Sequence, residues 1–111
     1  MVEIDATPAR ALLRIQAQYG PYRVFITELS DENSRKYRYY VLQGNEVEAG
    51  FDNSPDPRAL RLKYGQIGAE HVGEYIPHLH RANKTQLLLT EEMSCVDFVH
   101  WLHQHLPLAQ L

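Results

Sequence analysis

The sequence predicts an α+β fold, in which an antiparallel sheet of four to five strands carries an N-terminal and a C-terminal helix on one face. Three observations lead to this prediction. Apolar residues recur at helical spacing near both ends of the chain, β-like segments follow one another between those ends, and only short turns separate the first three of these segments. Short links between consecutive strands favour antiparallel pairing.

The N-terminal helix is expected over Pro8–Tyr19. Thr7 can cap a helix, and proline suits the first helical position. The Gly20-Pro21 dipeptide then ends the segment. Residues at helical spacing form its buried stripe, namely Ala9, Leu12, Leu13, Gln16 and Tyr19.

Three strands are expected next. Tyr22–Ser30 alternates between two faces, and Lys36–Gln43 is rich in tyrosine and valine. Gly44-Asn45 makes a tight turn into the third strand, Glu46–Asp52. The three segments together predict an antiparallel meander.

The second half of the chain is less regular. Asn53–Glu74 holds prolines, glycines and little periodicity, so we expect a long, partly ordered loop there. Tyr75–His80 is expected to be a short extended piece, and Thr85–Thr90 a well-buried strand. Ser94 can cap a final helix that Pro107 stops, with Asp97 in a near capping box. Its apolar stripe is Cys95, Phe98, Val99, Leu102 and Leu106.

Size and composition indicate one folded domain, residues 1–111. The chain has 111 residues, of which 44% are hydrophobic. Its one cysteine, Cys95, rules out an intrachain disulfide and is expected to pack in the core. We expect a cytoplasmic protein, because the first residues include Glu3 and Asp5 rather than a signal peptide and no apolar run matches a membrane span.

Charge is unevenly distributed along the chain. The formal net charge is −3, yet Pro57–Lys84 carries five basic and two acidic residues. The segments on either side are each acidic. A local basic centre matters more than net charge for attracting a polyanion such as RNA.

The sharpest chemical signal is His78-Leu79-His80. In an extended segment both imidazoles point to one side and Leu79 to the other. One histidine could remove the proton of an RNA 2′-hydroxyl while the other returns a proton to the leaving oxygen. We expect His78 and His80 to be catalytic and His71 to support them. The plain alternative is a pair of surface histidines on an edge strand.

The same spacing also suits a metal ion. Zinc or iron would need a third ligand, and His71 or Glu74 could supply it. The cupin pattern, a glutamate four or five residues later, fails because Lys84 and Thr85 stand there. Nearby cations also disfavour a bound cation, so the sequence favours metal-independent chemistry and no cofactor.

Basic and aromatic residues near the histidines form the expected substrate-binding set. Phosphate pairing together with a stacking ring is a common way to hold a single-stranded nucleic acid. The alternative is a solvated loop, and the histidines close by in the sequence favour the binding interpretation. The set is Arg58, Arg61, Lys63, Tyr64, Arg81 and Lys84.

The final helix carries three more histidines. His100, His103 and His105 are expected on its polar face, although His100 and His103 lie one turn apart and could bind a metal. Trp101 beside the apolar stripe could mark a surface for a protein partner.

Several of these pieces resemble the TumE-type toxin family, small bacterial proteins also filed as a domain of unknown function. The resemblance covers about Tyr22 to Leu106. It rests on Phe51-Asp52-Asn53-Ser54-Pro55, on Pro77-His78-Leu79-His80, and on Leu89-Thr90-Glu91-Glu92 before a closing helix. Family members often carry further histidines after the Asp-Asn-x-Pro turn, where this chain has Asp56-Pro57-Arg58.

This resemblance implies the toxin of a bacterial toxin–antitoxin module with ribonuclease activity. Its partners would be RNA and an antitoxin of helix-turn-helix type, and a homodimer is compatible with the sequence. In the turn, Asp52 and Asn53 are expected to satisfy local backbone groups, with Asp52 orienting a histidine as the secondary interpretation. Two other hypotheses stay open: a non-catalytic protein-interaction module and a histidine-ligated metal enzyme.

Overall fold

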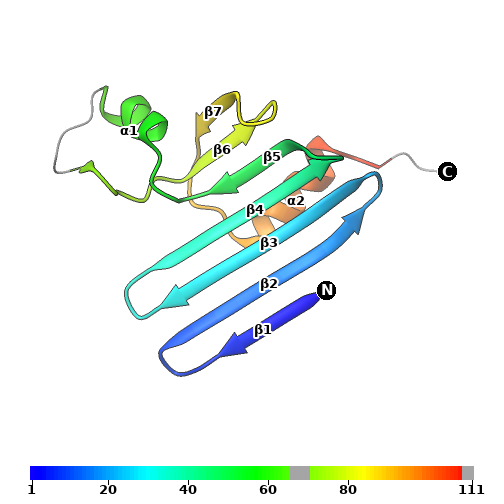
Figure 1. The fold of residues 1–111 in the computed structure, drawn as a ribbon, viewed down its shortest axis with the longest axis horizontal. Coiled ribbons are helices and arrows are strands. Elements are labelled where there is room, and N and C mark those ends of the chain that lie inside the picture. Colours follow the sequence, from blue (N-terminus) through cyan, green and yellow to red (C-terminus); the bar gives the residue numbers. More distant parts are fainter. Residues whose placement is uncertain (66–70, 109–111) are drawn as a thin grey trace.

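The computed structural model, which describes residues 1–65 and 71–108, is built on a seven-stranded antiparallel sheet (Figure 1). Each strand pairs with its neighbours in the chain, so the sheet is a meander from β1 to β7. The expected antiparallel pairing is correct, but the prediction of four to five strands between two terminal helices is wrong. The strands are β1 Val2–Ala6, β2 Arg10–Tyr19, β3 Tyr22–Asp31, β4 Arg35–Gln43, β5 Glu46–Asp52, β6 His78–Arg81 and β7 Gln86–Leu89.

The N-terminal helix is the main error, because Pro8–Tyr19 lies almost entirely in strand β2. The segment also alternates with a period of two: Leu13, Ile15 and Tyr19 face one side, and charged or amide side chains largely occupy the other. Pairing along the whole length of β3 favours the strand. Thr7 does cap, but it caps the β1–β2 turn, where its hydroxyl accepts from the backbone N–H of Arg10 at 3.1 Å.

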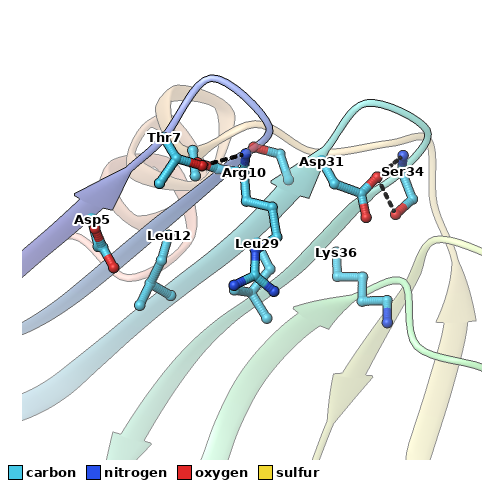
Figure 2. A pocket seen from close by; sticks show the side chains of 10 residues that line it. Asp5, Thr7, Arg10, Leu12, Leu29, Asp31, Ser34 and Lys36 are labelled. Carbon is cyan, nitrogen blue, oxygen red and sulfur yellow. Dashed lines mark hydrogen bonds between the residues drawn. The ribbon is translucent and has the colours of Figure 1, made fainter.

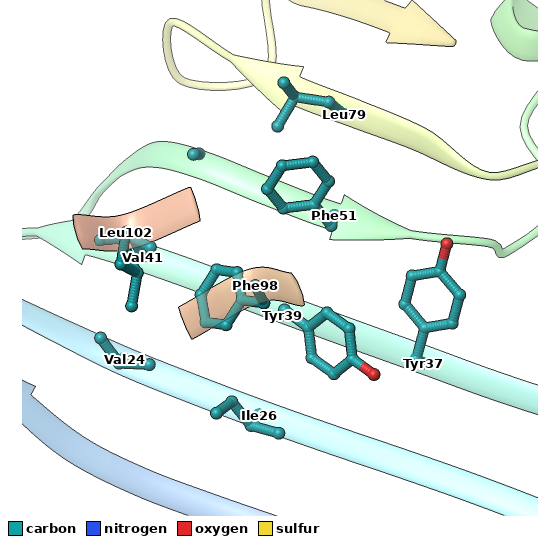
Figure 3. Close-up of a cluster of buried hydrophobic side chains, with 10 residues drawn as sticks. Val24, Ile26, Tyr37, Tyr39, Val41, Phe51, Leu79, Phe98 and Leu102 are labelled. Carbon is teal, nitrogen blue, oxygen red and sulfur yellow. The ribbon is translucent and has the colours of Figure 1, made fainter. Parts of the chain in front are cut away.

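The C-terminal helix α2, Cys95–His105, forms as expected and covers one face of β3–β5 (Figure 3). Ser94 and Asp97 make the capping box in full. Phe98 and Leu102 are buried against a layer of strand residues that includes Val24, Ile26, Tyr39, Val41 and Phe51. Val99, which the expected stripe included, is 37% exposed.

A second helix, α1 Pro57–Tyr64, stands where a loop was expected. Asp56 caps it by accepting from the N–H of Arg58, Pro57 begins it, and Gly65 ends it with φ 78°. Ala59 and Leu60 pack against Ile76 and Leu87. Leu87 points to the face opposite Leu88 and Leu79, so α1 and α2 cover opposite faces of the sheet. Residues 66–70 of that expected loop lie outside the described residues.

Strand β7 is at the edge of the sheet, next to β6. Thr85–Thr90 therefore contains the expected strand but is not well buried, since Leu88 is 53% and Leu89 40% exposed. Neither helix in the described part of the chain has the length and hydrophobicity needed to cross a bilayer.

Candidate functional site

Asp52, His78 and His80 form a buried polar cluster on the face of the sheet that α1 covers. Strands β5 and β6 bring them together, because the register pairs Asp52 with His78 and Gly50 with His80. Side chains two residues apart on β6 share a face, so both imidazoles lie beside the Asp52 carboxylate. All three residues are at least 96% buried.

The ligand-type atoms of this cluster converge on one point. His78 Nε2 lies 3.1 Å from Asp52 Oδ1, and His80 Nε2 lies 3.5 Å from Asp52 Oδ2. The two Nε2 atoms are 3.2 Å apart. In a tetrahedral site with metal–ligand bonds of about 2.0–2.2 Å, neighbouring ligand atoms are about 3.3–3.6 Å apart. The three contacts are close to that spacing, with each histidine facing a different oxygen of Asp52, and one ligand atom from each residue lies within 4.8 Å of the others.

Neighbouring hydrogen bonds fix the orientation of two members. His78 Nδ1 lies 2.7 Å from the carbonyl oxygen of Ile76, so Nδ1 carries the proton and donates it there. That bond turns Nε2 toward the cluster, as in many histidine metal ligands. Asp52 accepts from the hydroxyl of Tyr40 at 2.9 Å and from the N–H of Ser54 at 2.9 Å.

These contacts shift the acidity of the cluster. Burial alone would raise the pKa of Asp52, but hydrogen bonds with His78 and His80 outweigh it and hold that pKa well below its usual range. Burial would lower the pKa of His78, but its bonds with Asp52 and the Ile76 carbonyl raise it. Burial and the Asp52 charge raise the pKa of Tyr40 to about 12. The carboxylate is thus ionised, which suits either a metal ion or an imidazolium partner.

Two of the expected substrate-binding residues lie beside this cluster. The Arg58 guanidinium is 3.5 Å from His80 Nδ1 and donates to the backbone carbonyl of Lys84 at 2.9 Å. The Lys84 ammonium lies 5.0 Å from the ring centre of Tyr40. A hydrogen bond from Arg58 to His80 would place the His80 proton on Nε2, but 3.5 Å is at the outer limit for such a bond.

The other residues of the expected substrate-binding set lie elsewhere. Arg81 turns to the opposite face, where it stacks over Trp101 at 5.3 Å and donates to the Glu48 carbonyl. Arg61 is exposed on α1. Lys63 and Tyr64 pair with Glu74 instead of reaching the histidines.

His71 belongs to this second cluster rather than to the first. Its ring stacks on Tyr64 with 3.7 Å between ring centres, and Nδ1 lies 3.4 Å from Glu74. The structure therefore does not bring His71 together with His78 and His80. Asp52, not His71 or Glu74, occupies the third position beside them.

The remaining candidates lie outside the Asp52, His78 and His80 cluster. Asn53 extends the β-ladder, accepting from the Tyr37 N–H and donating to the Arg35 carbonyl. His100, His103 and His105 are exposed on α2, as expected. Cys95 packs against the core, and burial raises the pKa of its thiol. Trp101 is half-buried edge-on against Phe51.

Sequence reasoning underestimated Asp52 and missed Tyr40. Asp52 is the last residue of an alternating strand, two positions after Gly50, and so shares a face with any residue paired opposite it. The sequence alone does not show which residues lie opposite Asp52, because 25 residues separate β5 from β6 and the register between the two strands decides it. Asp52 also satisfies a backbone group of the turn, as expected, because its carboxylate accepts from the Ser54 N–H.

Comparisons with known proteins give no relative: no protein-family model, no curated protein and no solved structure matches this chain.

Proposed function

We propose that this protein binds a divalent transition metal through Asp52, His78 and His80. The observation that carries the proposal is the approach of three buried ligand groups: the two Nε2 atoms are 3.2 Å apart, and each faces one oxygen of the Asp52 carboxylate, at 3.1 Å from Oδ1 and 3.5 Å from Oδ2. One ligand atom from each residue lies within 4.8 Å of the others. Two imidazole nitrogens and one carboxylate oxygen are a donor set that suits zinc, iron and copper better than magnesium or calcium. Three protein ligands would leave one tetrahedral position for water or a substrate oxygen.

Surrounding groups support the metal proposal. The Ile76 carbonyl fixes the tautomer of His78, and Tyr40 and Ser54 hold the carboxylate. Such outer contacts raise metal affinity by orienting the ligands. The negative charge of Asp52 also reduces the repulsion between a bound cation and the Arg58 guanidinium, which lies 3.5 Å from His80 Nδ1.

Metal titration of the purified, EDTA-stripped chain tests this proposal. We expect one Zn²⁺ per chain by isothermal titration and elemental analysis, with protons released only to the extent that His78 was protonated. His78→Gln and Asp52→Asn should each weaken binding at least tenfold. Arg58→Ala is the matched control beside the cluster, because it removes a cation and no ligand, and should bind zinc as tightly as the unchanged chain or more tightly. Stoichiometric binding that survives His78→Gln would reject the site.

RNA cleavage is the second candidate function. It is favoured by the two adjacent Nε2 atoms, the ionised Asp52 and the Arg58 guanidinium next to His80. One imidazole would take the 2′-hydroxyl proton, the oxygen would attack phosphorus, and the other imidazole would protonate the leaving 5′-oxygen. Arg58 would stabilise the charge on the phosphorane.

Burial sets a condition on that second function. His78 is 1% and His80 4% exposed, so a phosphodiester reaches them only if the groups that cover them move aside. Incubation with single-stranded RNA, in EDTA and separately with Zn²⁺, decides between the mechanisms. Cleavage in EDTA that is abolished by His78→Ala supports a metal-independent ribonuclease, in line with the ribonuclease activity that the toxin resemblance implies. Cleavage only with Zn²⁺ supports a metal-dependent one, and none in either condition removes both.

A further inference from the structure

The face of the sheet opposite α2 presents two aromatic rings side by side. Phe25 on β3 and Tyr40 on β4 are direct partners in the register and are both half-buried. Their neighbours Ile26 and Tyr39 point the other way, into the core beneath α2. Gly50 is the next residue in the same row, and the Tyr40 ring lies over it, since a β-carbon there would fall 2.8 Å from that ring.

A shallow hollow of about 320 Å³ opens over these rings. Phe25, Thr27, Arg38, Tyr40 and Leu42 line it. We call this surface the Phe25–Tyr40 face. Its volume lies at the lower end for small-ligand sites, about 300 Å³. Its floor is aromatic and its rim is cationic.

Exposed cations surround both rings. The Arg23 guanidinium lies 5.7 Å from the ring centre of Phe25, and that of Arg38 lies 5.2 Å from the centre of Tyr40. On the β6–β7 side the Lys84 ammonium lies 5.0 Å from the same Tyr40 ring. Arg58 follows, joined to Lys84 through its carbonyl. Cations that form no ion pair with a described residue therefore edge the two rings from β3 to the β6–β7 turn.

The β6–β7 turn holds Lys84 in place with an unusual backbone. Ala82, Asn83 and Lys84 all have positive φ, at 51°, 54° and 68°. Left-handed residues of this kind cost energy unless the surroundings fix them. Asn83 does so, because its N–H donates to the Val47 carbonyl and its side-chain oxygen accepts from the Val47 N–H. The turn is thereby pinned to β5 with Lys84 over Tyr40.

Negative charge on this face is either neutralised or distant. Asp52 shares the row of Arg38 but is buried and hydrogen-bonded to the histidines. A second hollow at the far end of the same face mixes Arg10 and Lys36 with Asp5 and Asp31 (Figure 2). Its charges balance, and Asp56 pairs with Arg58 at 3.3 Å, so the anion-attracting part is limited to Arg23, Arg38 and Lys84.

We propose that the Phe25–Tyr40 face binds single-stranded nucleic acid. Unpaired bases would stack on Phe25 and Tyr40, and successive phosphates would pair with Arg23, Arg38 and Lys84. A sheet face with half-buried rings edged by cations is suited to this ligand, because every base has a flat π-face and every nucleotide a negative phosphate. In a duplex the bases are stacked internally and cannot reach the rings. This proposal goes beyond the metal site and does not depend on it.

Fluorescence anisotropy with labelled 12-nucleotide RNA, DNA and the matching duplex tests the proposal, in EDTA so that the metal plays no part. We expect single strands to bind, and the duplex to bind at least tenfold more weakly. Phe25→Ala should weaken single-strand binding on the order of tenfold, with an unchanged salt dependence, since stacking carries the loss. Arg38→Ala should instead reduce the slope of log affinity against log salt by about 0.7.

Two variants control for folding and for plain basicity. Phe25→Leu keeps an apolar side chain on the strand but removes the ring, so it should lose affinity as Phe25→Ala does while melting near the unchanged chain. Arg61→Ala with Lys63→Ala removes two exposed cations of α1 away from the face, and should change affinity less than threefold. Equal binding by Phe25→Leu and the unchanged chain, or tighter binding of the duplex, would overturn the proposal. Equal affinity for RNA and DNA supports recognition by rings and phosphates alone, and tighter RNA binding adds a contact to the 2′-hydroxyl.

Discussion

Gly50 should be intolerant of even one added carbon, and the reason is the ring of Tyr40. A β-carbon at Gly50 would lie 2.8, 2.9 and 3.0 Å from three atoms of that ring. The ring cannot move freely, because its hydroxyl donates to buried Asp52 and Arg38 and Lys84 lie near it. We therefore expect Gly50→Ala to destabilise the fold.

The magnitude follows from two opposing effects. Alanine in a strand is favoured over glycine by about 0.5–1 kcal/mol, through lower chain entropy in the unfolded state. Forcing a carbon into a filled space costs about 1–3 kcal/mol. The net expectation is a loss of about 0–2.5 kcal/mol in the free energy of unfolding, centred on about 1 kcal/mol.

Changing the ring should reverse the sign of the effect. In a Tyr40→Val background the clash is gone, so Gly50→Ala should stabilise by about 0.5–1 kcal/mol. In a Tyr40→Phe background the ring remains and the substitution should still destabilise. Urea unfolding followed by Trp101 fluorescence measures all three differences, since that indole packs on Phe51 in the core. The same free-energy change in every background would refute the reasoning.

Three further predictions concern the helices. Phe98→Ala should cost about 3–5 kcal/mol in unfolding free energy, because Phe98 is fully buried between Tyr39 and Phe51. As the control, His100→Ala on the exposed side of α2 should change the unfolding free energy by less than about 0.5 kcal/mol in the same urea titration. Asp56→Ala should cost about 0.5–2 kcal/mol through loss of the α1 cap, and hydrogen exchange should rise first at the N–H of Arg58. Hydrogen bonds from the Ser94 backbone and side chain lower the pKa of Asp97. The ionised Asp97 therefore stabilises the folded chain fully above the ordinary carboxyl pKa, and this stabilisation is lost as the pH falls through the lowered pKa of the folded state. The stability gap between the unchanged chain and Asp97→Asn should then shrink on acidification, and a gap independent of pH would contradict it.

Local patterns were sufficient for part of the fold. The hairpin from β4 to β5 and the capped helix α2 could be predicted because tight turns and capping residues act within a few neighbours. The same capping logic was ambiguous elsewhere. Thr7-Pro8 and Asp56-Pro57 are similar signals, yet only the second begins a helix, and only pairing with β3 decides that the first leads into a strand.

What the sequence alone determined is which chemistry is present: two histidines with their side chains on one face of an extended segment, and cations nearby. What only the tertiary structure decided is which groups meet. The β5–β6 register places Asp52 against His78 and His80, while His71 joins Tyr64 and Arg81 turns to Trp101. Likewise, Phe25 and Tyr40 become neighbours only when β3 pairs with β4. The physical reason is that side-chain direction along a strand is local, whereas the partner across the sheet is set by burial of the whole face at once.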